Sequence, residues 1–322
     1  MIVITGGSGF IGSCILKKFN ENGKSNIIVV DRMGTEDKWK NLVGKKFHRL
    51  FHKNEFLEKI RFDTDLRNSI STIIHMGACS TTTETNVDYI MSNNLNYSIE
   101  LARFAAENDV RFIYASSAAT YGDGSNGYND ALFDDLRPLN PYGLSKHLFD
   151  LWLIDNRLDK EFIGLKFFNV FGPNEYHKDD MASMVYRSFN QIIETGEVKL
   201  YKSNALEFGD GGQKRDFIYV KDVVNVIWKL QETEKYAGIY NMGTGKPRSW
   251  NDLVNAVFSS MGKESNINYI DMPDNLINQY QNFTQAQMEK FEANLFPMNF
   301  ATLEDAIDDY VKNYLMKTWK HL

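Results

Sequence analysis

The segment YGLSK holds a tyrosine and a lysine four residues apart, Tyr142 and Lys146. Positions i and i+4 share one face of a helix, so a helix here would hold the lysine ammonium beside the phenol. A free phenol has a pKa near 10, and lowering that pKa by about three units corresponds to about 4 kcal/mol. The pair is therefore a candidate acid/base. The competing interpretation is a surface pair, because the same spacing is common on helices.

A serine-rich segment, YASSAATYG, stands upstream at the end of a predicted strand, Phe112–Ser116. Ligands of open α/β sheets bind beyond the carboxyl ends of the strands. A hydroxyl there can hold a substrate oxygen beside Tyr142. Ser117 is the candidate for this role, and Ser116 is the next candidate, as a substrate contact. The alternative is a serine-rich turn without a ligand.

The segment TGGSGFIG, residues 5–12, follows a predicted strand, Ile2–Thr5, and opens a predicted helix, Ile11–Asn20. Its glycines, Gly6, Gly9 and Gly12, allow a tight turn and a close approach of the backbone to a pyrophosphate. The N-terminus of the helix then offers free N–H groups to the phosphates. The context predicts a dinucleotide site, and an empty glycine turn is the alternative.

A carboxylate, Asp31, ends the second predicted strand, Ile27–Val30, where it can bond the ribose hydroxyls of the adenosine half. Three cations follow it: Arg32, Lys38 and Lys53. An arginine facing a 2′-phosphate favours NADP over NAD. For the two lysines, the alternative is ordinary solvated surface charge.

The first half of the chain alternates short apolar runs with helical patterns, which predicts a doubly wound parallel sheet of the Rossmann type. The further elements predicted there are a strand Thr72–Met76, a helix Tyr89–Asn108, a helix Ser145–Asn156 and a strand Phe162–Val170 that ends at Gly172-Pro173.

The second half predicts a smaller, partly interleaved substrate domain. Its predicted elements are a helix Met181–Glu194, a loop Ser203–Gln213, an extended segment Asp216–Val220, a helix capped by Asp222, a strand Gly238–Met242, a helix Ser249–Met261 capped by Ser249, a strand Asn266–Ile270 and a last helix Leu303–Leu315. We assign residues 1–172 to the dinucleotide domain, to which 216–242 returns, and 173–322 mainly to the substrate domain.

Composition narrows the function classes. The formal net charge of −6 argues against a nucleic-acid or membrane-surface binder. No apolar run is long enough for a transmembrane helix, and MIVITGG does not look like a signal peptide. The two cysteines, Cys14 and Cys79, suit a reduced cytoplasmic compartment and not a disulfide framework. We predict no metal site.

Together, TGGSGFIG, SSAATYG and YGLSK resemble the extended short-chain dehydrogenase/reductases that modify nucleotide-activated sugars. The segments HMGACSTTTE, FFNVFGPNEYHKDDMAS, QKRDFIYVKDV, NMGTGKPRSW and YQNFTQA resemble the ADP-L-glycero-D-manno-heptose 6-epimerases within that superfamily. The resemblance implies tightly held NADP, oxidation of carbon 6 of ADP-heptose to a transient ketone, and hydride return to the opposite face. It also implies a role in lipopolysaccharide inner-core synthesis and a homo-oligomer, as a pentamer.

The resemblance also implies roles for individual residues. A second acid/base is Lys178, in HKDDMAS. The positions that match cofactor contacts, besides the three glycines, are Phe10, Ile11, Asp31, Arg32, Lys38, Lys53, Met76, Gly77, Ala78, Cys79, Ser80, Asn93, Lys146, Val170 and Lys178. The positions that match substrate contacts are Asn169, Asp180, Arg187, Tyr201, Lys202, Ser203, Asn204, Arg215 and Tyr280.

Two of these positions depart from the family pattern, because a serine is common at Asp180 and a histidine at Arg187. The alternatives within the superfamily are a 4-epimerase or a reductase. A 4,6-dehydratase is disfavoured, since Ala118-Ala119 stands where an Asp-Glu pair would remove a proton. An alternative outside the enzymes is a protein that binds NADP without catalysing a reaction. The presence of both Tyr142 and Lys146 disfavours this interpretation.

Overall fold

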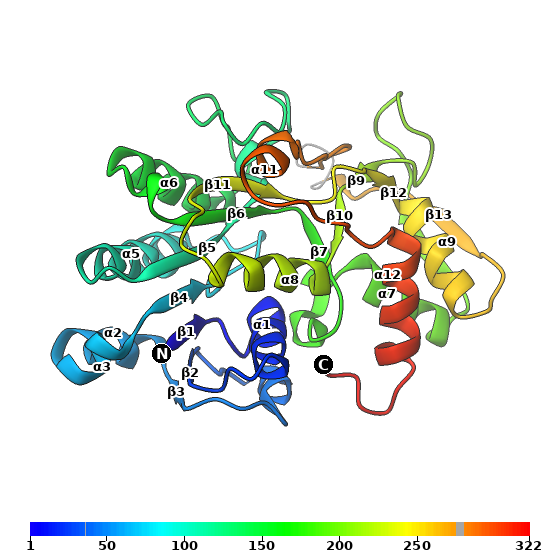
Figure 1. Ribbon diagram of the computed structural model, residues 1–322. Coiled ribbons are helices and arrows are strands. Elements are labelled where there is room, and N and C mark those ends of the chain that lie inside the picture. Colours follow the sequence, from blue (N-terminus) through cyan, green and yellow to red (C-terminus); the bar gives the residue numbers. More distant parts are fainter. Residues whose placement is uncertain (36, 275–279) are drawn as a thin grey trace.

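A parallel sheet of seven strands forms the centre of the computed structural model, which describes residues 1–35, 37–274 and 280–322 (Figure 1). Every neighbouring pair of strands in this sheet is parallel. In spatial order the strands are β11 (Gly238–Met242), β6 (Ile163–Phe167), β5 (Arg111–Ser117), β4 (Thr72–His75), β1 (Ile2–Thr5), β2 (Ile27–Val30) and β3 (Arg49–Phe51). The chain reverses its direction of progress across the sheet between β1 and β4, which is where doubly wound sheets bind ligands.

Side chains of the central strands alternate between two buried clusters, as the two-residue period of a strand requires. In β1, Ile2 and Ile4 belong to one cluster and Val3 to the other. The first cluster includes the buried faces of α1 and α8, and the second includes those of α2, α5 and α6. Both faces of the sheet are therefore covered by helices, which confirms the predicted fold class.

The helices are α1 (Phe10–Glu21), α2 (Lys53–Phe62), α3 (Thr64–Ser69), α4 (Val87–Ile90), α5 (Tyr97–Glu107), α6 (Pro141–Asp155), α7 (Met184–Glu194), α8 (Val220–Gln231), α9 (Trp250–Ser260), α11 (Glu289–Asn294) and α12 (Leu303–Tyr310). Short 3₁₀ or π turns include η1 (Asp37–Leu42), η2 (Met91–Asn96), η3 (Ala118–Tyr121), η4 (Leu158–Lys160), η5 (Tyr176–Met181) and η6 (Val311–Leu315). In the described part of the chain, none of the helices is both long enough and apolar enough to cross a bilayer.

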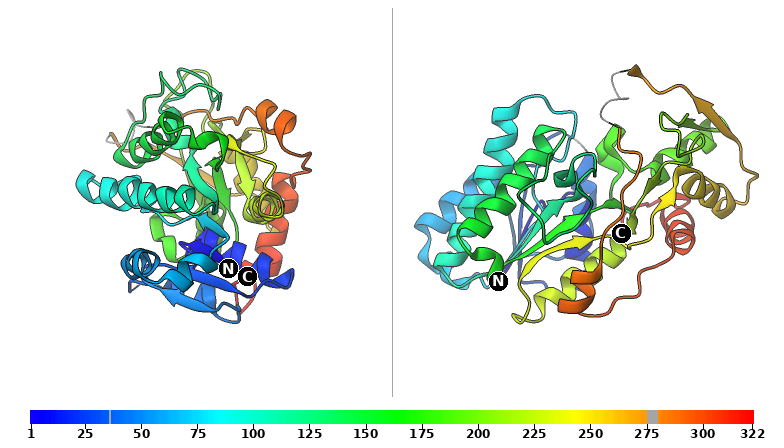
Figure 2. Two further views of the ribbon diagram at one scale, coloured as in Figure 1. Left: turned by 60° about the vertical axis from the view of Figure 1, so that its left-hand side comes forward. Right: turned by 90° about the horizontal axis from the view of Figure 1, so that it is seen from above.

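Three small two-stranded sheets lie beyond the central one. They pair β7 (Asn169–Phe171) with β10 (Phe217–Tyr219), β8 (Val198–Tyr201) with β13 (Ile267–Ile270), and β9 (Lys214–Arg215) with β12 (Arg248–Ser249). The right-hand view of Figure 2 sets α9 and α12 apart from the central sheet and its helices. The first hydrophobic cluster nevertheless runs without a break from α1 and α8 into α7, α9 and α12.

Several predicted boundaries shift. Helix α6 begins at Pro141, four residues before the predicted start, because the Asn140 side chain caps it by accepting from the N–H of Gly143 at 2.8 Å. The strand predicted as Phe162–Val170 divides at Phe168 into β6 and β7, which pair in different sheets.

The two predicted helix caps have different outcomes. Ser249 caps α9 in a capping box with Asp252, as predicted. The prediction for Asp222 is wrong, because this residue lies inside α8 and its carboxylate accepts from the N–H of Ala301 at 2.9 Å.

Candidate active site

The glycine loop makes a tight turn between β1 and α1. Gly6 has a φ of +64°, and the N–H of Gly9 donates to its carbonyl at 2.9 Å. A Cβ on Gly12 would stand 2.2 Å from the Gly6 oxygen, and one on Gly6 would stand 2.8 Å from the Gly77 backbone. Side chains are thus excluded where β1, β4 and α1 meet, which is the packing that a dinucleotide loop needs.

Asp31 ends β2 and faces the same loop. Its carboxylate accepts from the N–H of Ser8 at 3.0 Å and from the Lys38 ammonium at 2.9 Å. Lys53 donates to the Asn93 side chain, and burial together with the charge of Arg32 lowers its pKa. Three cations thus gather at the carboxyl end of β2 around one carboxylate. A phosphate there would be stabilised by the excess positive charge.

A cleft of about 600 Å³ opens over these elements, at the carboxyl ends of the central strands. Every predicted cofactor position lines it: Gly6, Gly9, Phe10, Ile11, Gly12, Asp31, Arg32, Lys38, Lys53, Met76, Gly77, Ala78, Cys79, Ser80, Asn93, Lys146, Val170 and Lys178. The candidate chemical residues Ser117 and Tyr142 line the same cleft. The glycine loop, the carboxylate and the cations therefore fit a dinucleotide.

Tyr142 and Lys146 lie on α6, at the wall of the cleft. Burial raises the pKa of the Tyr142 phenol, and a hydrogen bond with Ser117 partly lowers it. Burial lowers the pKa of Lys146 to about 8, and its ammonium donates to the carbonyl oxygen of Ala115 at 2.7 Å. Without a cofactor, burial is thus the largest influence on the pKa of the tyrosine.

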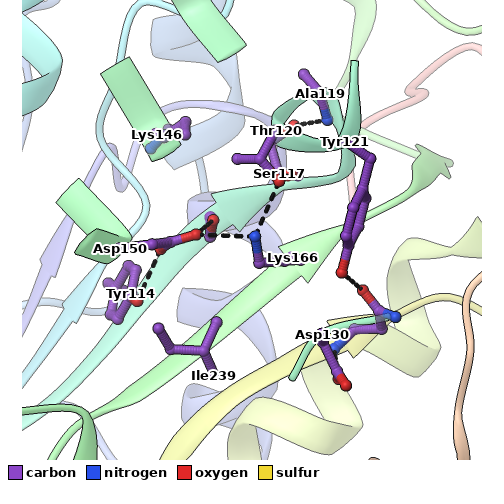
Figure 3. A network of polar contacts seen from close by, with 12 residues as sticks. Tyr114, Ser117, Ala119, Thr120, Tyr121, Asp130, Lys146, Asp150, Lys166 and Ile239 are labelled. Carbon is purple, nitrogen blue, oxygen red and sulfur yellow. Dashed lines mark hydrogen bonds and ion pairs between the residues drawn. The ribbon is translucent and has the colours of Figure 1, made fainter. Parts of the chain in front are cut away.

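A buried network lies behind this wall (Figure 3). Lys166 on β6 and Asp150 on α6 form a fully buried ion pair at 3.1 Å. The Ser116 hydroxyl donates to Asp150 at 2.7 Å, and the residue, although buried, lines the first cleft. Lys166 also donates to the hydroxyl of Thr120, which in turn donates to the carbonyl of Ser117. The network fixes the strand end that carries Ser117.

A second cleft, of about 540 Å³, adjoins the first. Both are lined by Asn169, Val170, Lys178 and Met181, so Lys178 lies at their junction. The predicted substrate positions that line the second cleft are Asn169, Asp180, Arg187, Tyr201 and Tyr280. Asp180 and Arg187, the two positions that depart from the family pattern, are thus brought to its wall.

Lys178 is carried by η5, which follows Gly172-Pro173. Burial lowers the pKa of its ammonium, whereas the charge of Glu175 raises it. Its Nζ stands 5.7 Å from the ring centre of Phe10, at the start of α1. Glu175 is buried and closes the loop at its base, accepting from the backbone N–H of Ser183 at 2.6 Å and of Gly172 at 3.3 Å.

Four predicted substrate positions lie away from the walls of both clefts. Lys202 is exposed and paired with Asp271 at 2.9 Å, because its loop turns outward after β8. Ser203 donates to the Ala205 carbonyl in the same loop, and Asn204 is exposed. Arg215 is buried behind the second cleft, with its guanidinium over the rings of two wall residues, Trp250 and Tyr280.

Several wall residues were not predicted. In the second cleft they include Glu175 and Trp250, and in the first Tyr89 and Tyr97. Trp250 follows the Ser249 cap directly, and that position at the start of a helix was a readable signal. Tyr89 and Tyr97 fall within the long predicted helix 89–108, where nothing distinguished them from core aromatic residues.

Residues 2–243 match the model of the NAD dependent epimerase/dehydratase family. The chain belongs to this family. It is 49% identical to an ADP-L-glycero-D-manno-heptose-6-epimerase of Nitratidesulfovibrio vulgaris (strain DP4), with 98% of each chain covered. It is 44% identical to an enzyme of the same name from Fusobacterium nucleatum subsp. nucleatum over the full length of both chains.

Among solved structures, the Helicobacter pylori ADP-L-glycero-D-manno-heptose-6-epimerase superposes with a TM-score of 0.81. It is 31% identical, and the superposition covers 97% of this chain and 95% of the other. These relatives confirm the resemblance drawn from the motifs. The chain is an isomerase of the epimerase class, and its family uses a nicotinamide cofactor.

Proposed function

We propose that this protein inverts carbon 6 of the heptose in ADP-glycero-manno-heptose, with NADP as its cofactor, in the synthesis of lipopolysaccharide inner-core precursors. One observation carries the proposal: two groups able to exchange protons line one cleft from opposite sides of the sheet. Tyr142 comes from α6, in the second hydrophobic cluster, and Lys178 stands over Phe10 at the start of α1, in the first. Inversion needs a proton donor or acceptor on each face of a planar ketone.

The arrangement around Asp31 supports NADP. Lys38 already contacts the carboxylate, so Arg32 and Lys53 remain to face a 2′-phosphate. Burial and the charge of Arg32 lower the pKa of Lys53, as expected where two cations are close without an anion between them. A phosphate would relieve that repulsion, whereas a bare ribose hydroxyl would not.

NADP bound in this cleft would supply a hydride acceptor for carbon 6 and, in its oxidised form, a positive charge. A positive charge in this cleft lowers the pKa of the Tyr142 phenol, which opposes the effect of burial. Ser117 holds the oxygen on carbon 6 beside Tyr142, and Tyr142 takes the proton of that hydroxyl as the ketone forms. Lys146 keeps a second positive charge on the same helix face.

Lys178 acts on the other face of the ketone. After the ketone has turned in the site, hydride return makes an alkoxide, and the Lys178 ammonium donates the proton that this alkoxide needs. Burial lowers the pKa of Lys178 and makes the proton easier to give up. Its place at the junction of the two clefts suits a group that must reach both cofactor and sugar.

The second cleft suits the nucleotide half of the substrate. Tyr201, Tyr280 and Trp250 supply aromatic walls, and Arg187 supplies a cation for a pyrophosphate. Arg215 stiffens this wall from behind, because its guanidinium stacks on two of the rings.

Two measurements test the proposal. The purified protein is denatured and the released nucleotide identified, and NADP is expected, whereas NAD alone contradicts the cofactor assignment. Proton NMR then follows ADP-heptose incubated with the protein, and interconversion of the two carbon-6 epimers is expected. Inversion at carbon 4 of a nucleotide hexose, with ADP-heptose unchanged, would point instead to a 4-epimerase.

We further propose a cytoplasmic homo-oligomer, a pentamer by family resemblance. Cys14 and Cys79 are free thiols, which suits a reducing compartment. Light scattering of the purified protein measures the assembly, and a monomer at micromolar concentration would contradict the proposal.

A further inference from the structure

A buried asparagine links the glycine loop to the segment that leads to Lys178. Asn41 of η1 is fully buried and belongs to the wall of neither cleft. Its Nδ2 donates to the carbonyl of Ser8, in the glycine loop, at 3.0 Å and to the carbonyl of Asn174, just before η5, at 3.1 Å. The two protons of one amide group thus join the two halves of the proposed active site.

The direction of that amide is set from the far end of the sequence. The Oδ1 of Asn41 lies 2.7 Å from the Nδ1 of His321. Since an oxygen can only accept, the proton of this bond belongs to Nδ1. If the amide turned over, its oxygen would face the Ser8 and Asn174 carbonyls with no proton between them. The His321 N–H thus adds to the preference of the two carbonyls for the orientation that joins the two segments.

The segment around His321 is docked firmly enough to act in this way. The Tyr176 hydroxyl donates to the carbonyl of Lys320 at 2.6 Å, and the His321 ring packs edge-on against the Tyr176 ring at 5.1 Å. Figure 1 shows the red C-terminal segment leaving α12 and returning to a place beside α1.

Asn174 itself needs support. It has a φ of +79°, a left-handed conformation that costs energy in residues other than glycine. Its side chain donates to the Ser13 hydroxyl of α1 at 2.9 Å and accepts from the N–H of Leu322 at 2.8 Å. The strained residue that starts the Lys178 loop is thus held by α1, by Asn41 and by the C-terminal segment.

We propose that His321 is a positioning residue: its Nδ1–H orients the Asn41 amide, which fastens the glycine loop to the Lys178 loop. Dinucleotide binding and proton delivery from Lys178 then depend on one hydrogen bond outside both clefts. The part that concerns Lys178 rests on the proposed function, whereas the part that concerns the dinucleotide does not.

Three substitutions at one position test the proposal. An asparagine in place of His321 puts an N–H donor where Nδ1 stands, alanine removes the donor, and aspartate replaces it with an acceptor. We expect H321N to resemble the wild type, H321A to lose bound dinucleotide about tenfold faster, and H321D to lose it faster still. The readout is the half-life of the nucleotide on the purified protein after dilution.

Turnover gives the second readout. H321A and H321D should lower kcat for epimerisation. They should leave the KM for ADP-heptose near its wild-type value, because neither His321 nor Asn41 lines the second cleft. A purely structural role would lower the melting temperature in all three variants alike and would not rank them by donor and acceptor. His48 is exposed, so H48D is the matched control for an added charge and should behave as the wild type.

The outcomes separate the two ideas. If H321N is as damaging as H321A, or if H321D retains its nucleotide like the wild type, the positioning role is overturned. The three variants could show the expected ranking in nucleotide retention while neither they nor the wild type epimerise ADP-heptose. In that case the proposed function fails, and the positioning of the glycine loop stands.

Discussion

The two adjoining clefts are walled in different ways. The dinucleotide cleft opens at the carboxyl ends of the strands of one sheet, and every position predicted for the cofactor lies on its wall. The second cleft is assembled from several separate segments, among them β7, η5, α7, β8 and α9, and five of the positions predicted for the substrate lie off its wall. A site made by backbone at strand ends follows from local motifs, whereas a site made by side chains from separate segments depends on how those segments pack.

Loss of the Tyr142 hydroxyl should have the largest effect, because it removes the acid/base and leaves the backbone of the dinucleotide cleft intact. We expect Tyr142→Phe to lower kcat by about 10²–10⁴-fold with NADP still bound. Steady-state epimerisation and nucleotide content measure the two effects. Tyr89→Phe, in the same wall, is the control and should keep its activity. A Tyr142→Phe enzyme with most of its kcat would remove this residue from the mechanism.

A substitution of Lys178 tests whether the residue at the junction of the two clefts is the second acid/base. Lys178→Met should block inversion, by about 10²-fold or more, yet still permit reduction of a 6-aldehyde analogue on one face. Both reactions are followed on the same preparation. Lys199→Met, which removes a lysine from the wall of the second cleft alone, should leave inversion unchanged. Near wild-type inversion by Lys178→Met contradicts the two-base assignment, and His177, which lines the dinucleotide cleft, becomes the next candidate.

Arg32 tests whether the dinucleotide side is as specific as its motifs suggest. Arg32→Ala should weaken NADP by about tenfold or more, the loss expected for one charge-assisted hydrogen bond. NAD lacks the 2′-phosphate and serves as the internal control, so its affinity should change little. The Kd values of both nucleotides for the stripped protein decide the matter, and equal losses would contradict a 2′-phosphate contact.

The pH profile probes Lys146 without a change in the sequence. Its pKa is lowered to about 8, so the ammonium loses its proton as the pH rises through that value, and the charge that supports a Tyr142 phenolate disappears. Epimerisation should fall about tenfold per pH unit above 8. An arginine stays charged there, so Lys146→Arg should move this fall in activity to higher pH even if its kcat is lower. If the activity of Lys146→Arg falls at the same pH as that of the wild type, Lys146 is not the group that titrates.

The smallest effect is expected for the substrate positions, where we compare a residue on the wall of the second cleft with a predicted residue that lies off it. Arg187→Met should raise the KM for ADP-heptose several-fold, because its cation lines the second cleft. Lys202→Met should leave KM unchanged, since Lys202 is exposed and pairs with Asp271. The reverse ranking would show that the walls of the second cleft rearrange around the substrate.

How far the sequence could predict the molecule depends on the range of the interactions. Strand β1 and the glycine loop were predictable, because apolar runs and glycine spacing are local signals. The early start of α6 was also readable in the Asn140-Pro141 pair, although the apolar pattern suggested a later start. The break at Phe168 was not predictable, since it depends on β10 pairing with β7 rather than on the strand itself.

The same limit applies to the site. Asp222 looked like a helix cap, but its partner is the N–H of Ala301, 79 residues downstream. Arg215 matched a substrate contact of the family, but its place behind Trp250 and Tyr280 depends on the packing of segments that are far apart in sequence. Side-chain types indicated the right chemistry, and only the tertiary packing determines which of them reach the cleft.

The hydrogen bond between Asn41 and His321 joins residues 280 positions apart. During synthesis it therefore forms much later than the contacts within the N-terminal part of the sheet. During synthesis the N-terminal strands and the glycine turn can pair long before the partner of Asn41 has left the ribosome. Until then the Asn41 oxygen lacks the donor that it has in the folded protein. A nascent chain that has already built its nucleotide fold should consequently hold the nucleotide only briefly, and firm retention should begin once the segment around His321 has docked.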